Sequence, residues 1–235
     1  MQPAEVSIPS EPVPPASAVH EASEPSVPAK AVQLATLAKQ VAECRRCALA
    51  AMRTQTVFGE GNPESPLMLV GEGPGHEEDA TGRPFVGRAG KLLDECLQEC
   101  GLSRRHVYIC NVVRCRACIR ESGSIRNRPP TPDEISACTS WLRQTIEIAA
   151  PMVILCLGAP SAGVIIHKNF RMMQERGRFF ATPFARSAIA AMHPAYVLRQ
   201  HGAAYEAARG SLIEDIAAAR AKVIELKRQP ASALL

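Results

Sequence analysis

The feature that most constrains the fold is a regular alternation of short apolar runs with longer helical patterns. Four runs bounded by turn residues are typical of buried strands, namely 66–71, 106–111, 152–157 and 187–192. Helices are expected over 31–53, 89–100, 131–149 and 205–226, with one more after Gly158. Such an order predicts an α/β fold: a three-layer α/β/α sandwich with a central, mostly parallel four-stranded sheet. The helix start at Thr131-Pro-Asp-Glu134 is the most clearly marked, because it combines a cap, a proline and a capping box.

Residues 1–30 differ in composition from the rest of the chain. They contain seven prolines, four glutamates and one lysine, a mixture that cannot bury enough apolar surface to offset the entropy of ordering. We expect a disordered leader followed by one domain over 31–235. With one lysine and four glutamates, the leader has a net charge of −3. Since the whole chain has a net charge of +4, the domain has a net charge of about +7. A basic domain suits a polyanionic partner, although basic proteins of other kinds are common.

The sequence gives no sign of a membrane or export signal. No run approaches the roughly 18 to 20 apolar residues that span a bilayer, and the N-terminus lacks a basic segment followed by an apolar one. We therefore expect a cytoplasmic protein with no membrane partner. In that compartment the nine cysteines favour metal binding over disulfides.

Three polar residues follow three different predicted strands at the point where each strand ends. Glu72, Asn111 and His193 occupy these positions. Open α/β sheets place ligand sites at the carboxyl ends of their strands, so the three side chains are expected to share one pocket. The glycine-rich turn at 71–75 does not fit a dinucleotide fingerprint, because its third glycine is misplaced and Glu72 would face the pyrophosphate.

The cysteines suggest a four-thiolate metal site. Cys44 and Cys47 form a Cys-x2-Cys pair. The second pair is open between Cys115 with Cys118 and Cys115 with Cys138, and spacing does not separate zinc from iron-sulfur. Three further cysteines, Cys96, Cys100 and Cys156, lie in apolar segments and are interpreted as core residues.

Several motifs resemble those of one known family. They are Gly71–Leu93 (GEGPGHEEDATGRPFVGRAGKLL), Asn111–Cys115 (NVVRC), Asn127–Pro132 (NRPPTP) and His193–Arg199 (HPAYVLR). Together they are similar, in the same order, to the family 4 uracil-DNA glycosylases, and the resemblance runs from about residue 41 to residue 199. It implies a monofunctional DNA glycosylase that hydrolyses the N-glycosidic bond of uracil in DNA and leaves an abasic site for base excision repair. The implied partner is uracil-containing DNA, single- or double-stranded, bound by a monomer.

The resemblance also implies a cofactor and its ligands. Members of this family hold a structural [4Fe-4S] cluster, and the ligand positions correspond here to Cys44, Cys47, Cys115 and Cys138, with Cys118 as an extra thiol. Four arginines flank these cysteines, namely Arg45, Arg46, Arg114 and Arg116, and are candidates for phosphate contacts.

Roles for the pocket residues follow from the same resemblance. Phe85 would stack on a uracil rotated out of the DNA, Asn111 would bind its pairing edge, and Gly73 would bring the backbone close to it. His193 would donate to uracil O2, and Glu72 would stabilise the sugar cation or position water. Glu78 is the candidate for excluding thymine at C5.

The segment after His193 is the candidate DNA wedge. Tyr196, Val197 and Leu198 would enter the vacated stack, and Arg199 would contact a phosphate.

Two features depart from the family pattern. The segment 116–126 is longer than usual, as in a related branch that traps uracil-DNA through a histidine in this loop. Pro129 stands where that histidine would fall, which predicts turnover without a covalent adduct. The second departure is His76, where many relatives carry an acidic residue; it could add pH dependence near neutrality.

Two other functions remain open from the sequence. One is a protein that binds uracil in DNA without releasing it, and the other is a metal-binding accessory module of DNA-associated proteins. The pair Glu72 and His193 discriminates against both, because neither function requires such groups at strand ends.

Overall fold

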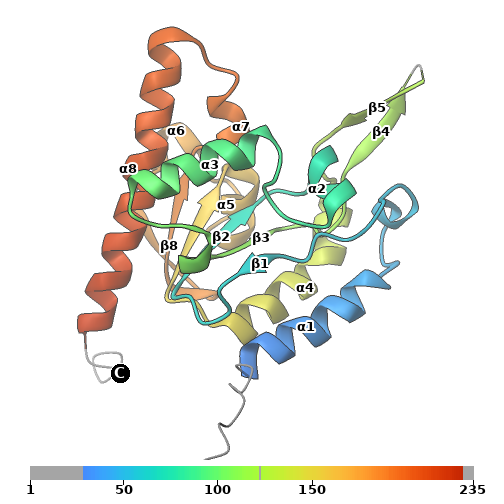
Figure 1. Cartoon of the computed structure of the whole chain (residues 1–235), viewed down its shortest axis with the longest axis horizontal. Helices are drawn as coiled ribbons and strands as arrows, with labels where there is room; N and C mark the ends of the chain where they lie inside the picture. Colours follow the sequence, from blue (N-terminus) through green and yellow to red (C-terminus); the bar gives the residue numbers. More distant parts are fainter. Residues whose placement is uncertain (1–28, 122, 230–235) are drawn as a thin grey trace, which may run out of the picture.

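The computed structural model describes residues 29–121 and 123–229, which form an α/β structure (Figure 1). The helices are α1 (Ala29–Ala42), η1 (Ala48–Ala51), α2 (His76–Thr81), α3 (Arg88–Glu99), η2 (Arg104–His106), α4 (Pro132–Ala149), α5 (Ala159–Ile165), α6 (Met172–Glu175), α7 (Pro194–Val197) and α8 (Gly202–Arg228). The strands are β1 (Glu60–Gly61), β2 (Leu67–Gly71), β3 (Tyr108–Asn111), β4 (Cys118–Glu121), β5 (Ser124–Asn127), β6 (Val153–Leu157), β7 (Phe179–Thr182) and β8 (Ala185–Ala191). None of the described helices is both long and apolar enough to cross a membrane.

The main sheet has the strand order β1-β3-β2-β6-β8-β7. The four strands predicted from the sequence are its parallel centre, β3-β2-β6-β8, whereas β1 and β7 pair antiparallel at the two edges. The predicted α/β class is confirmed, but the predicted number of four strands is wrong. β1 has only two residues, and β7 is a four-residue Phe-Phe-Ala-Thr segment that is exposed or half-buried along its length, so neither has the longer buried run of a central strand.

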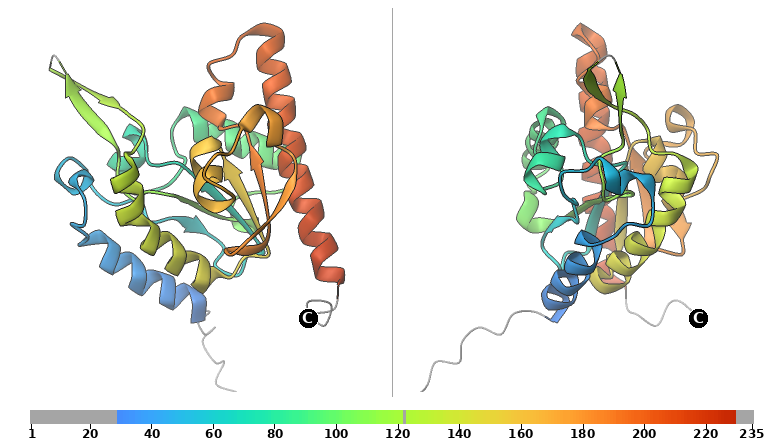
Figure 2. Two further views of the ribbon diagram at one scale, coloured as in Figure 1. Left: turned by 180° about the vertical axis from the view of Figure 1, so that it is seen from behind. Right: turned by 90° about the vertical axis from the view of Figure 1, so that its right-hand side faces the viewer.

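Alternate residues of the central strands enter two different cores. In β2, Met68 and Val70 pack with α1, α4 and α5, whereas Leu67 and Leu69 pack with α3 and α8. The two helical layers lie on opposite sides of the sheet in Figures 1 and 2. Because both faces are covered, these strands are unbroken apolar runs in the sequence.

The N-terminal region differs from the prediction in two ways. The chain is already helical at Ala29, and Lys30 donates to the carbonyl of Ala149 at 2.8 Å; the rest of the predicted leader lies outside the described residues. The predicted helix over 31–53 is too long, because α1 ends at Ala42 and only the short η1 follows. The intervening chain turns so that Cys44 and Cys47 line a pocket with cysteines from elsewhere.

The start of α4 is as predicted. The Thr131 hydroxyl accepts from the backbone N–H of Glu134 at 3.3 Å, and the Glu134 carboxylate accepts from the backbone N–H of Thr131 at 2.8 Å. This capping box and the proline at the first turn fix where the helix begins.

The lengthened segment forms a hairpin that the sequence prediction missed. Strands β4 and β5 pair antiparallel and project from the body of the molecule (Figures 1 and 2). The sequence did carry a signal, since Ser122-Gly123 separates two short segments that each contain an Ile-Arg pair.

Candidate active site

A cavity of about 420 Å³ opens at the carboxyl ends of the central strands. Its lining includes six residues singled out from the sequence: Glu72, Gly73, Glu78, Phe85, Asn111 and His193. Glu72 follows β2, Asn111 ends β3, and His193 lies two residues after the end of β8. The structure thus places in one cavity the strand-end residues that were expected to meet there.

Asn111 is buried at the end of β3. Its side chain is 1% exposed, and among the described residues its Oδ1 has no hydrogen-bond partner. Its own carbonyl accepts from the Arg114 guanidinium at 3.0 Å. A buried polar atom without a partner is costly, so this amide is set to receive a ligand group.

Gly71 lies between Asn111 and Phe85. A Cβ at this position would be 2.4 Å from Asn111 Oδ1 and 2.6 Å from Phe85 Cζ. Glycine is therefore the residue that lets the amide and the aromatic ring approach each other on one side of the cavity.

Gly71→Ala is expected to lower the activity of the site by at least about 10²-fold, because displacement of these groups by about 1 Å is enough for such a loss. Thermal and urea unfolding should show that the free energy of unfolding falls by about 1–3 kcal/mol, because the added methyl group overpacks the site. Gly210→Ala is the control, because a Cβ there meets nothing within 4 Å in α8 and should stabilise by about 0.5–1 kcal/mol. Activity of Gly71→Ala equal to that of the control would contradict the packing described.

Phe85 presents a fixed aromatic face. Its φ of 53° lies in the left-handed region, where a non-glycine residue is strained. The Arg104 guanidinium donates to the carbonyls of Pro84 and Phe85 and also pairs with Asp94. The ring centroid lies 5.7 Å from that of His193 at an interplanar angle of 30°. Nothing in the sequence pointed to Arg104 as the residue that holds this loop.

His193 is set up as a neutral hydrogen-bond donor. Its Nδ1 accepts from the backbone N–H of Ala195 at 3.0 Å, which leaves the proton of the neutral ring on Nε2. Burial lowers the pKa of His193 to about 4, and the positive charge of Arg199 adds to this shift. At neutral pH the imidazole is uncharged.

The two acidic residues of the cavity have different surroundings. Burial raises the pKa of Glu72, which is partly exposed to the cavity. The Glu78 carboxylate accepts from the backbone N–H groups of Gly75, Val86 and Gly87 at 2.9–3.0 Å. Glu78 therefore stabilises the loop that carries Phe85. A contact between Glu78 and a base stays a prediction.

The predicted wedge segment lies at one rim of the cavity. Tyr196 is 38% exposed, and the Arg199 guanidinium carbon lies 6.0 Å from the centroid of its ring. Leu198 is partly buried against the core. Val197 is fully buried, so the suggestion that it enters a DNA stack is wrong.

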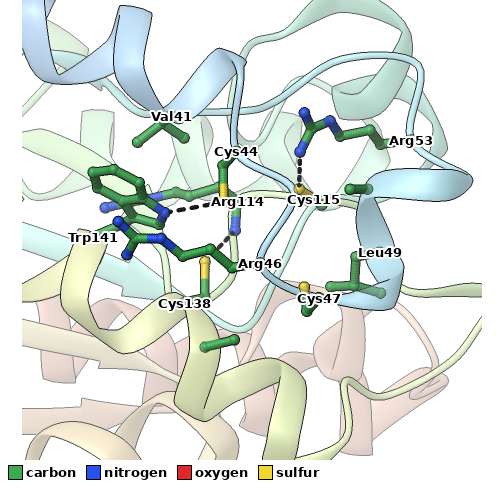
Figure 3. Close-up of a pocket in the computed structure, with 12 residues that line it drawn as sticks. Val41, Cys44, Arg46, Cys47, Leu49, Arg53, Arg114, Cys115, Cys138 and Trp141 are labelled. Carbon is green, nitrogen blue, oxygen red and sulfur yellow. Dashed lines mark hydrogen bonds between the residues drawn. The ribbon is translucent and has the colours of Figure 1, made fainter.

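Four cysteines from three segments line a second, smaller pocket (Figure 3). They are Cys44, Cys47, Cys115 and Cys138, the set implied by the family resemblance. Cys118 lies in β4 and does not line this pocket. The other three cysteines, Cys96, Cys100 and Cys156, are core residues as interpreted.

Three N–H groups point at the sulfurs of this pocket. Trp141 Nε1 donates to Cys44 at 3.3 Å, an Arg53 guanidinium N–H donates to Cys115 at 3.2 Å, and the Arg114 backbone N–H donates to Cys138 at 3.3 Å. Burial raises the pKa of Cys138 to about 11, and because a metal ligand must be the thiolate, metal binding there would release a proton. The pocket thus fits a metal centre bound by four thiolates.

Two of the four arginines proposed for phosphate contacts are occupied inside the protein. Arg114 is 1% exposed and binds the Asn111 carbonyl and the Thr145 hydroxyl. Arg116 is 8% exposed and contacts Asn127 and His76. The prediction that these two arginines contact phosphates is wrong, because their guanidinium groups are buried and bind other residues of the protein.

Comparison with known proteins places this geometry in a family. The model of the uracil DNA glycosylase superfamily matches residues 58–217, more than half of the chain. The chain belongs to the uracil-DNA glycosylase superfamily. The superfamily match includes every cavity residue discussed above together with Cys115 and Cys138, whereas Cys44 and Cys47 precede it.

Individual members of the superfamily are similar to this chain, two of them over most of its length. The type-4 uracil-DNA glycosylase of Thermotoga maritima is 42% identical over 185 residues, which cover 78% of this chain and 91% of that protein. The type-4 uracil-DNA glycosylase of Pyrobaculum aerophilum is 36% identical over 193 residues, which cover 79% of this chain and 92% of that protein. The type-5 uracil-DNA glycosylase of the same organism is 33% identical over 113 residues, which cover 42% of this chain and 46% of that protein.

Proposed function

We propose that this protein hydrolyses the N-glycosidic bond of uracil in DNA and leaves an abasic site for repair. The observation that carries the proposal is the buried Oδ1 of Asn111, which has no partner in the part of the chain that the structure describes and lies in a cavity that also holds the Phe85 ring. An amide matches the adjacent donor and acceptor of the uracil pairing edge, and cytosine presents a different pattern. Superfamily membership supports the same reaction.

The nucleotide must leave the duplex before its glycosidic bond can be reached. In the cavity, the Phe85 ring would stack on the base while Asn111 binds N3–H and O4. The base is then oriented by two groups that the fold already holds in place, so little ordering is needed when it binds.

His193 and Glu72 would act on the bond that breaks. Negative charge develops on uracil O2, where the Nε2–H of neutral His193 can donate a hydrogen bond. Glu72, as a carboxylate, would stabilise the positive charge on the sugar or position the water that adds to it. With Pro129 in place of a loop nucleophile, water completes the reaction and no covalent adduct remains.

The cysteine pocket would hold a [4Fe-4S] cluster through Cys44, Cys47, Cys115 and Cys138. Their sulfurs line one pocket and three of them accept N–H groups, which supports a thiolate-bound group at this position. When bound, the cluster supplies a cross-link between the segment after α1, the segment after β3, and α4.

Uracil release from single-stranded and duplex oligonucleotides tests the function. Alkali-sensitive sites at uracil are expected from the unmodified protein, with a loss of about 10²–10³-fold in His193→Ala, since a donor to developing charge is removed. A denaturing gel reports any adduct. Binding of uracil-DNA without alkali-sensitive sites, by protein that retains its cluster, would reject the enzyme in favour of a binding protein.

The lowered pKa of His193 predicts a pH dependence of stability. Because the folded-state pKa of about 4 lies below the ordinary 6.5, the unfolded chain binds the proton more readily. The stability from this residue is fully present above about pH 6.5 and is lost as the pH falls toward 4, by up to about 3 kcal/mol. Urea unfolding of the unmodified protein and His193→Gln between pH 4 and 7 measures the difference. Parallel profiles would contradict a His193 that is neutral at pH 7 in the folded protein.

A further inference from the structure

The hairpin formed by β4 and β5 has a fixed base. Just before β4, Arg116 donates to Asn127 Oδ1 at 2.6 Å and contacts His76 Nδ1 at 3.1 Å, which ties the hairpin to α2. Just after β5, Arg128 donates twice to the Glu134 carboxylate at 2.6 and 2.7 Å, which ties the hairpin to α4. The hairpin is therefore anchored to the rest of the domain next to both of its strands.

One face of the hairpin continues the wall of the active-site cavity. Cys118 pairs with Asn127, and Arg120 pairs with Ile125, so these four residues share a face. Asn127 lines the cavity. Farther along the same face, Ile125 is 46% exposed and Arg120 is exposed.

The charges on the two faces differ. On the opposite face Arg126 forms an ion pair with Glu121, so these two charges compensate each other. Among the described residues Arg120 has no ion-pair partner. The face that continues the cavity therefore carries Arg120, a cation without an ion-pair partner in the described part of the chain, beside the exposed Ile125.

The base of the hairpin and α7 both border the cavity, through Asn127 and Ala195. The rim at α7 carries Tyr196 and Arg199, again an exposed side chain with an apolar body beside a cation. The hairpin and the α7–α8 region project toward the same end of the molecule and flank the strand ends between them (Figures 1 and 2).

We propose that the β4–β5 hairpin is a second DNA-binding arm, which contacts the strand beside the extruded nucleotide across the cavity from α7. Arg120 neutralises a phosphate, and Ile125 packs against a sugar or base. The inference rests on the proposed function for its substrate. It adds a contact surface to the cavity residues described above.

Binding to a uracil-free 30-mer duplex, followed by fluorescence anisotropy at several salt concentrations, tests the arm. Arg120→Ala should weaken binding about 3- to 10-fold and reduce the slope of log affinity against log salt by about 0.9, because one phosphate contact is lost. Ile125→Ser should weaken binding with the slope unchanged. Arg105→Ala is the matched control, since this exposed arginine lies before β3, at the amino ends of the strands.

Uracil release at saturating DNA is measured on the same variants and should stay within about threefold of the unmodified rate. If Arg120→Ala and Ile125→Ser bind DNA as tightly as Arg105→Ala, the proposal is overturned and a protein partner becomes the better occupant of this face. A fall in release with unchanged binding would also overturn it. Absence of uracil release from the unmodified protein would reject the proposed function, whereas the anisotropy result would still decide on the arm.

Discussion

Replacement of Asn111 by alanine is expected to lower the rate of uracil release by about 10³-fold or more while leaving the fold intact. A site built to bind the polar edge of a base loses most of its discrimination when those bonds are absent. The stability should change by less than about 1 kcal/mol, because the substitution removes a buried Oδ1 that has no partner among the described residues. Single-turnover release and urea unfolding measure the two effects.

Asn62→Ala is the control for this substitution. Asn62 is truncated in the same way but lies in a turn at the amino ends of the strands, where its Oδ1 accepts from the backbone N–H of Glu64 at 2.9 Å. It should lose some stability and keep its activity, the reverse of the pattern expected at Asn111. Asn111→Ala with activity within tenfold of the unmodified protein would show that the pairing edge is read elsewhere.

Much of the site could be predicted because parallel strands bring their carboxyl ends to one edge. Residues at the ends of β2 and β3 and just after β8 therefore meet even though 121 positions separate Glu72 from His193. The central strands could be predicted for a different reason: burial on both faces produces continuous apolar runs in the sequence. The prediction failed for β1, which has two residues, and for β7, whose apolar run of Phe-Phe-Ala is too short to mark a strand and is partly exposed.

The groups that hold the site in place were harder to anticipate. Arg104 reaches the carbonyl of Phe85 from η2, and Arg114 reaches that of Asn111 from the interior. Arginines in a basic chain are usually interpreted as surface charges, and the sequence contains no pattern that marks a buried one. Such contacts depend on the tertiary path of the loops, which local spacing does not determine.

The metal pocket and the base-binding residue are connected through a short stretch of chain. Asn111 and Cys115 are four positions apart, and Arg114 lies between them. The Arg114 backbone N–H donates to the Cys138 sulfur, and its guanidinium donates to the Asn111 carbonyl. A change at the cysteines should therefore reach the amide that binds the base.

Cys138→Ser is expected to abolish the broad absorption near 400 nm of an iron-sulfur protein and to leave a chain that no longer unfolds cooperatively. A structural metal centre contributes apparent binding free energies on the order of 10 kcal/mol, comparable to the whole stability of a domain. Cys118→Ser is the matched control, because Cys118 is also buried but does not line the pocket, and it should keep both the absorption and the activity. Iron content, absorption and thermal unfolding distinguish the two variants. Loss of iron in Cys118→Ser with retention in Cys138→Ser would reverse the ligand assignment, and the Arg114 contacts would then no longer connect a metal ligand to Asn111.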